Sequence, residues 1–214
     1  MIYSENILIC IAIPLLISLI FTDKNTRRFI AGFLTGMIVC LLSAYISGFV
    51  HYITGISQND TAVYYSPLIE ETMKLLPVLF YMFVFFPDDN RVFIVSLSIG
   101  LGFATFENCC YILTSGASEV TYILIRGMAA GVMHLVCALV LVLGLSMARR
   151  FKVLSLPSVV GAASLAMIFH GLYNLLVSEP GFSSYLGYFL PVATALALFF
   201  PYRLSTRRKV PGNL

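Results

Sequence analysis

Residues 29–50 read FIAGFLTGMIVCLLSAYISGFV, an uncharged and largely apolar stretch of 22 residues that follows Lys24, Arg27 and Arg28. A transmembrane α-helix needs roughly 20 predominantly apolar residues to cross the hydrocarbon core of a bilayer. The same pattern recurs along the 214-residue chain, where long apolar blocks alternate with short polar breaks. The sequence therefore predicts an all-α fold, a polytopic bundle of transmembrane helices.

The composition supports this fold class. Hydrophobic residues make up 59% of the chain and charged residues only 11%, whereas about a quarter of the residues of a soluble domain are charged. A water-facing surface cannot be assembled from so few charges. The composition thus excludes a soluble globular enzyme, a disordered chain and a nucleic-acid binder, and it favours a multi-pass protein of a cell membrane.

Seven apolar blocks are long enough to be spans, and no soluble domain separates them. We therefore expect a single integral-membrane domain over residues 1–214. The seven predicted spans are 6–22, 29–50, 62–86, 91–114, 120–148, 154–177 and 184–203.

The positions of lysine and arginine give an orientation, because cytoplasmic loops of membrane proteins collect these residues. Eleven cations lie outside the predicted spans, and all of them fall on alternate connections of a seven-span chain. This alternation predicts an N-terminus outside the cell and a C-terminus in the cytoplasm. The eleven are Lys24, Arg27, Arg28, Arg91, Arg149, Arg150, Lys152, Arg203, Arg207, Arg208 and Lys209.

Glycine spacing indicates where helices pack closely. Gly32 and Gly36 on the second span, and Gly127 and Gly131 on the fifth, have the GxxxG spacing of close helix contacts in membranes. We expect both pairs to serve packing within the chain. The sequence does not specify an oligomeric state.

Seven ionisable groups lie inside four of the spans, where such groups are costly and normally mark function. At about 1.5 Å per residue, all of them fall between roughly 5 and 20 Å below the outer surface. This common depth predicts one buried site in the outer half of the bilayer. The groups are Glu70, Glu71 and Lys74 on the third span, Glu107 on the fourth, Arg126 and His134 on the fifth, and His170 on the sixth.

Helical spacing brings some of these groups together. Lys74 follows Glu70 by four residues and Glu71 by three, so its ammonium can neutralise either carboxylate. His170 and Asn174 are four residues apart and share a helix face. Taken singly, Lys74 could serve only as a counter-ion and Arg126 as a structural partner.

Glutamates and histidines in a partly hydrated pocket suit the activation of water. A glutamate can act as general base while histidine and asparagine stabilise an oxyanion, or histidine and glutamate can hold a metal ion that lowers the pKa of water. Neither HExxH nor GxSxG occurs, so the usual zinc-protease helix is absent and a serine hydrolase is disfavoured.

Four motifs follow one another along spans three to six, over about half the chain. In this order they resemble the PrsW family of bacterial intramembrane proteases, which belongs with the wider group of CAAX-type membrane endopeptidases. The motifs are Glu70-Glu71-x-x-Lys74; Gly102-Phe103-Ala104-x-x-Glu107-Asn108 with Tyr111; Arg126 and His134; and His170-Gly171-x-Tyr173-Asn174.

The resemblance implies a membrane-embedded protease of the bacterial plasma membrane, with a catalytic core over residues 62–177. Its substrate would be a single-pass membrane protein, typically an anti-sigma factor, cut at its extracytoplasmic juxtamembrane region in a first, site-1 cleavage. The wider group includes glutamate-only and metal-dependent mechanisms, so either no cofactor or Zn²⁺ is compatible with it.

Residue roles also follow from the resemblance. It implies a general base at Glu70 or Glu71, partners in water activation or metal binding at Glu107 and His170, and an oxyanion donor at Asn174. His134 would be a further ligand, in a metal set of His134, His170 and Glu107. Supporting roles fall to Lys74, Asn108 and Arg126.

Two other functions remain compatible with buried glutamates and histidines. A proton- or cation-coupled transporter would also place them in the membrane, although transporters usually show inverted repeats and a site near the midplane. A non-catalytic membrane scaffold would not require Glu71 or His170 for its function.

Overall fold

The computed structural model describes residues 3–115 and 119–207, with the side chains of 114–115 and 199–207 excepted, and within these ranges it contains helices and no β-strand. The prediction of an all-α fold is confirmed. The long helices are α1 (Ser4–Ser18), α2 (Lys24–Thr54), α4 (Ser66–Phe85), α5 (Asp89–Ser115), α6 (Val120–Arg150), α7 (Ser155–Ser178) and α8 (Phe182–Arg207). Short elements are α3 (Gln58–Asp60), the π-helical η1 (Thr61–Tyr65) and the 3₁₀-helical η2 (Lys152–Leu154).

Each predicted span overlaps one of the long helices, although 6–22 runs past the end of α1 and 62–86 begins in η1. Among the described residues, four helical segments are long and apolar enough to cross a membrane: 24–54, 89–113, 120–150 and 152–178. Helix α4 has 20 residues but carries Glu70, Glu71 and Lys74. Helix α1 and the apolar part of α8, residues 182–198, are shorter apolar helices.

Helix α2 begins at Lys24, five residues before the start of the predicted span at residue 29. Asp23 caps this helix by accepting a hydrogen bond from the backbone N–H of Asn25 at 2.9 Å. The hydroxyl of Thr26 donates to the same carboxylate and lowers the pKa of Asp23. Lys24, Arg27 and Arg28 therefore lie in the first turns of a helix.

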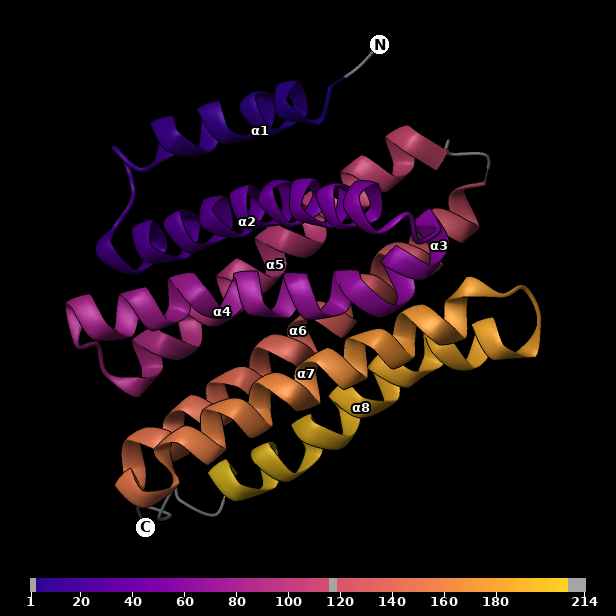
Figure 1. The fold of residues 1–214 in the computed structure, drawn as a ribbon. Helices are drawn as coiled ribbons and strands as arrows, with labels where there is room; N and C mark the ends of the chain where they lie inside the picture. Colours follow the sequence, from indigo (N-terminus) through magenta and orange to yellow (C-terminus); the bar gives the residue numbers. More distant parts are fainter. Residues whose placement is uncertain (1–2, 116–118, 208–214) are drawn as a thin grey trace.

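The helices run roughly side by side in a bundle (Figure 1). In this view the α1–α2, α4–α5 and α6–α7 connections lie at the left end, and the α2–α3, α5–α6 and α7–α8 connections lie at the right end. The most extensive contacts join α2 to α5, α6 to α7 and α5 to α6. Helices α5 and α6 therefore form the centre, while α1 packs on the outside of α2.

Two glycines let α2 and α5 approach closely. A Cβ atom at Gly36 would lie 2.1 Å from the carbonyl oxygen of Ile99, and one at Gly102 would lie 1.9 Å from that of Phe33. Close packing at Gly32 and Gly36 is therefore confirmed. The corresponding prediction for Gly127 and Gly131 is wrong, because a Cβ atom would meet no neighbour within 4 Å at Gly131 and would only touch the Asn108 side chain, at 3.9 Å, at Gly127.

Candidate active site

Four helices bring their ionisable side chains to one buried cluster. Helix α4 supplies Glu70, Glu71 and Lys74, α5 supplies Glu107, α6 supplies Arg126 and His134, and α7 supplies His170. The side chains of Glu71, Lys74, His134 and His170 are all less than 5% exposed. The clustering expected from the common depth of these residues is present.

A chain of hydrogen bonds connects three of the helices. His170 Nδ1 lies 2.8 Å from Glu71 Oε1, and Lys74 Nζ donates to the same carboxylate oxygen at 2.6 Å. The same ammonium lies 2.8 Å from His134 Nδ1. Since an ammonium group only donates, His134 Nδ1 is the acceptor of this bond.

The tautomer of His134 follows from that bond. With Nδ1 accepting from Lys74, the ring carries its proton on Nε2, which lies 2.5 Å from Glu107 Oε2. The chain of contacts thus continues from α6 to α5. Phe103, four residues before Glu107, packs against this chain of contacts, because Lys74 Nζ lies 4.2 Å from the centre of the Phe103 ring.

Arg126 and Asn108 border the cluster on the side of Glu107. Arg126 Nη1 donates to Asn108 Oδ1 at 2.6 Å, and Arg126 Nη2 lies 3.7 Å from Glu107 Oε1. The guanidinium stacks on the ring of Tyr111, with 3.4 Å between its carbon and the ring centre. The Tyr111 hydroxyl lies 2.8 Å from that of Tyr122.

Asn174, which we expected to donate to an oxyanion, makes a different contact. Its Nδ2 donates to the backbone carbonyl of Ala62 in the π-helical segment η1, at 3.0 Å. In the π register the backbone donor to this carbonyl would be residue 67, which is a proline and has no N–H. The Asn174 amide therefore satisfies a carbonyl that the helix leaves without its backbone partner.

Three residues could hold a metal ion. One ligand atom each from Glu70, His134 and His170 lies within 4.8 Å of the others. Our expectation was His134, His170 and Glu107. Glu70 takes the place of Glu107 in this set, and Glu107 Oε2 is hydrogen-bonded to His134.

The donor atoms of Glu70 and His170 fit a cation, whereas both ring nitrogens of His134 are hydrogen-bonded, to Lys74 and Glu107. Glu70 Oε2 is buried, has no hydrogen-bond partner and lies 3.8 Å from His170 Nε2. Because His170 Nδ1 donates to Glu71, its Nε2 carries a lone pair. A carboxylate that orients a histidine through its second nitrogen is the usual arrangement around a protein metal ion.

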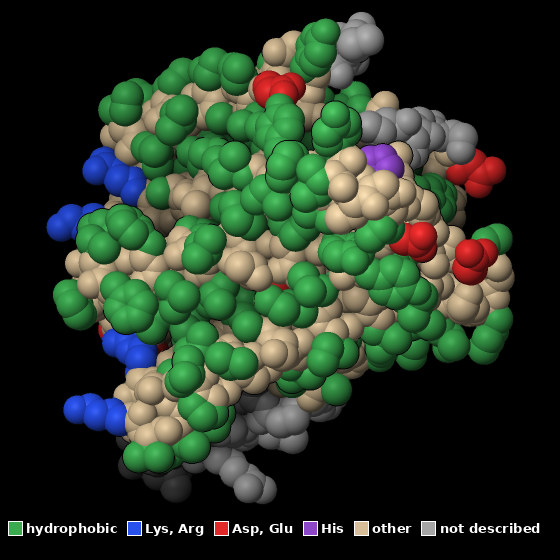
Figure 2. Space-filling view, viewed as in Figure 1, with side chains coloured by type: hydrophobic (Ala, Val, Ile, Leu, Met, Phe, Trp, Pro, Cys, Tyr) green, Lys and Arg blue, Asp and Glu red, His purple; other side chains and the backbone are tan. Residues whose placement is uncertain are grey.

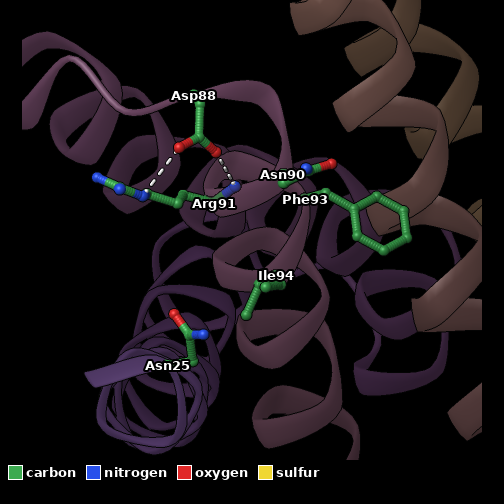
Figure 3. A pocket seen from close by; sticks show the side chains of 6 residues that line it. All are labelled: Asn25, Asp88, Asn90, Arg91, Phe93 and Ile94. Carbon is green, nitrogen blue, oxygen red and sulfur yellow. Dashed lines mark hydrogen bonds and ion pairs between the residues drawn. The ribbon is translucent and has the colours of Figure 1, made fainter. Parts of the chain in front are cut away.

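The space around the cluster is small. A cavity of about 40 Å³ adjoins it and is lined by residues that include Asn108, Tyr111, Tyr122 and Arg126. A larger hollow of about 430 Å³ lies at the opposite end of α5 (Figure 3). Its lining contains the ion pair of Arg91 with Asp88 at 2.9 Å, and none of the clustered residues contributes to it.

Sequence reasoning did not predict three features of the cluster. These are the bond from Lys74 to His134, the exchange of Glu107 for Glu70 in the candidate metal set, and the Asn174 contact with η1. The position of Pro67 was a usable signal for the last, because a proline leaves a carbonyl in the preceding turn without its N–H partner. The first two depend on how α4, α5 and α6 are rotated, which spacing along single helices does not determine.

Apolar helices that enclose a hydrogen-bonded cluster of carboxylates, histidines and a lysine define a membrane protein with an enzyme-like polar site. The chain matches the PrsW family of intramembrane metalloproteases over residues 24–201, and it belongs to this family. It is 26% identical over 203 residues to Protease PrsW of Oceanobacillus iheyensis (strain DSM 14371 / CIP 107618 / JCM 11309 / KCTC 3954 / HTE831), with 91% of each chain covered.

No solved structure matches the chain. Family membership confirms the sequence-based identification and makes the protein a membrane-embedded protease. It also implies a membrane protein as substrate and the bilayer as surroundings.

Proposed function

We propose that this protein is an endopeptidase of the bacterial plasma membrane that cuts a single-pass membrane protein in its extracytoplasmic juxtamembrane region. The observation that carries the proposal is the chain of contacts from His170 through Glu71, Lys74 and His134 to Glu107. Residues 1–214 form one domain, and residues 62–177 contain its catalytic core.

The proposed topology has seven spans, the N-terminus outside and the C-terminus in the cytoplasm. Lysine and arginine side chains gather at the left end of the visible face, and the acidic side chains lie mainly towards the other end (Figure 2). Positive charge marks the cytoplasmic end. Of the C-terminal cations used in the prediction, Arg208 and Lys209 lie outside the described residues, as do the side chains of Arg203 and Arg207.

The depth of the cluster supports a cut near the outer surface. Glu70, Glu71 and Lys74 lie within eight residues of the start of α4, and Glu107 and His170 lie eight residues before the ends of α5 and α7. These helix ends form the end of the bundle away from the cations (Figures 1 and 2). A single-pass substrate would therefore meet the site close to where its chain leaves the bilayer. An anti-sigma factor is the substrate that the resemblance to bacterial PrsW proteases favours.

We propose Glu70, His134 and His170 as ligands of a divalent cation, with Zn²⁺ as the candidate. With neutral histidines, the three glutamates of the cluster exceed its two cations, Lys74 and Arg126, by one charge. An uncompensated buried charge is costly, so the excess is removed either by a proton on a carboxylate or by a bound cation. His134 would exchange one of its hydrogen-bond partners for the ion. When bound, the ion would lower the pKa of a water molecule and polarise the scissile carbonyl.

The remaining residues then have separate roles. Glu107 is the proposed general base, because its side chain is 30% exposed against 14% for Glu70 and 0% for Glu71. It takes a proton from water and later gives one to the leaving amine. Glu71 and Lys74 are positioning residues that orient the two histidines. Arg126 pairs with Glu107, and Asn108 holds Arg126 in place. The resemblance implied Glu70 or Glu71 as the general base, and this proposal assigns that role to Glu107 instead. In the same proposal Asn174 holds η1 in place through its bond to Ala62 and does not donate to an oxyanion.

The test is cleavage of a tagged single-pass substrate by purified protein in detergent. We expect Glu107→Gln and His170→Ala to abolish cleavage, while Glu119→Gln, which alters a carboxylate with no side-chain capping bond at the start of α6, retains it. A chelator should stop the wild-type reaction and zinc should restore it. Full cleavage by both site variants would refute the site assignment, and cleavage that resists chelation would leave a glutamate-only mechanism.

A further inference from the structure

A small cavity, with a mainly apolar surface and four polar side chains in its lining, lies between the outer parts of α5 and α6. It measures about 40 Å³, and its polar lining comes from Asn108 and Tyr111 of α5 and from Tyr122 and Arg126 of α6. Asn108 is the residue next to Glu107, and Arg126 Nη2 lies 3.7 Å from Glu107 Oε1. Glu107 itself does not line the cavity, but two of the lining residues are its neighbours, Asn108 along the chain and Arg126 in space.

Glu71 and the two histidines of the cluster are closed to solvent. The side chains of Glu71, His134 and His170 are at most 2% exposed, whereas that of Glu107 is 30% exposed. Peptide hydrolysis consumes one water molecule for each bond cut, so water has to reach this site. Among the described residues, Glu107 is the most accessible carboxylate of the cluster, and the cavity lies on its side.

The size of the cavity suits water, and four of its lining side chains carry polar groups. A site needs about 10 to 15 Å³ of this kind of volume to hold one water molecule, and it needs two to four polar partners. A volume of 40 Å³ has room for a few molecules. The polar groups in its lining are the Asn108 amide, the Arg126 guanidinium and the hydroxyls of Tyr111 and Tyr122, each of which already has a hydrogen-bond partner in the protein and would share it with water.

We propose that this cavity is a hydration chamber that supplies the nucleophilic water to Glu107, an inference that rests on the proposed protease function. Water held there donates a proton to Glu107 while its oxygen bonds to the scissile carbonyl carbon. The C–N bond then breaks, and the proton leaves with the amine. Arg126, which donates a hydrogen bond to the Asn108 side chain, lies against Glu107 and orients the water next to it.

Gly127 provides a way to fill the chamber. It lines the cavity, and a Cβ atom there would meet only Asn108 Nδ2, at 3.9 Å. Gly127→Leu would project a side chain into the cavity, while Gly127→Ala would leave most of it open. Gly131→Leu is the matched control, because Gly131 lies one turn further along α6, outside the cavity lining, with nothing within 4 Å of its Cβ position.

Hydroxyl-radical labelling of the purified protein in detergent reads hydration without any cleavage. We expect oxidation of Tyr111 and Tyr122 in wild type, Gly127→Ala and Gly131→Leu, and a loss of at least about threefold in Gly127→Leu. Ile123→Phe, which fills the cavity from another wall residue, should give the same loss. Unchanged labelling in both filled variants would overturn the proposal.

Cleavage kinetics give the second readout. Gly127→Leu should lower kcat by about tenfold or more, equivalent to at least about 1.4 kcal/mol of activation free energy, with little change in KM or in bound zinc. Equal kcat values for Gly127→Leu and Gly131→Leu would also overturn the proposal. If no variant or wild type cleaves any substrate, the protease proposal fails on its own, and the labelling still decides whether the chamber holds water.

Discussion

Lys74 is the residue on which the two halves of the cluster depend. Its ammonium contacts Glu71 Oε1 at 2.6 Å and His134 Nδ1 at 2.8 Å, so it joins the His170 side to the Glu107 side. Spacing along the helix predicts that Lys74 is a counter-ion of a glutamate, and the structure adds its contact with His134. Lys74 also fixes which nitrogen of His134 carries the proton.

Removal of this charge should cost stability. Lys74→Met leaves Glu71, which is 0% exposed, without a cation, and a broken buried pair costs about 3 to 5 kcal/mol. Arg91→Met removes a cation from the exposed pair with Asp88 and should cost less than about 1 kcal/mol. Equilibrium unfolding in mixed detergent micelles measures both. Similar losses of unfolding free energy in the two variants would show that the buried pair stabilises the protein no more than the exposed pair does.

Glu70 and Glu71 are adjacent in sequence but differ in what they contact. The Oε2 atoms of both residues lack a hydrogen-bond partner, but Glu70 belongs to the candidate metal set, whereas Glu71 Oε1 is hydrogen-bonded to His170 and Lys74. The sequence places both carboxylates at the site without separating them, because a helix turns by only about 100° between neighbours and the partners come from other helices. Their roles become distinct only once α6 and α7 are in place.

Measurements of metal affinity should distinguish the role of Glu70 from that of Glu71. We expect Glu71→Gln to weaken zinc binding about 10- to 100-fold, as for residues that orient a ligand, and Glu70→Gln to weaken it further because a ligand is lost. Competition with a fluorescent chelator measures the dissociation constants, and Glu119→Gln serves as control. Stronger loss in Glu107→Gln than in Glu70→Gln would instead restore the set of His134, His170 and Glu107.

At the scale of elements, the contact between α2 and α5 depends on backbone approach. Gly36 faces the carbonyl of Ile99, and Gly102 faces the carbonyl of Phe33. This contact places the helix that carries Glu107 against the core of the bundle. GxxxG spacing predicted the α2 side of it and failed for Gly127 and Gly131, since the motif records small residues but not which face of the helix meets a neighbour.

A pair of substitutions within α2 tests this contact. Gly36→Ala would place a Cβ atom 2.1 Å from Ile99 O, whereas Gly48→Ala meets nothing within 4 Å. Both gain helix propensity, so their difference isolates the clash. We expect Gly36→Ala to be less stable than Gly48→Ala by about 1 to 3 kcal/mol, measured by thermal unfolding in detergent. Equal stability would mean that α2 and α5 are not this close.

At the scale of the whole molecule, the sequence predicts the number and order of the long helices and the common level of the polar residues. Both follow from one-dimensional patterns, the length of apolar blocks and the position of charges along them. The rotation of each helix and the π-helical start of α4 depend on contacts between distant segments, such as Asn174 with Ala62. The apolar pattern of residues 62–86 therefore predicts the span, but it does not predict the change from π-helix to α-helix within it.

The orientation of the bundle in the membrane is the remaining global prediction. In the seven-span topology, Gln58 in α3 lies outside and Asn90 at the start of α5 lies in the cytoplasm. A membrane-impermeant thiol reagent should therefore label Gln58→Cys in intact cells and Asn90→Cys only after permeabilisation. The wild-type chain measures background from its five cysteines. The reverse labelling pattern would place the cluster near the cytoplasmic surface, and a cut on the extracytoplasmic side would then be impossible for this site.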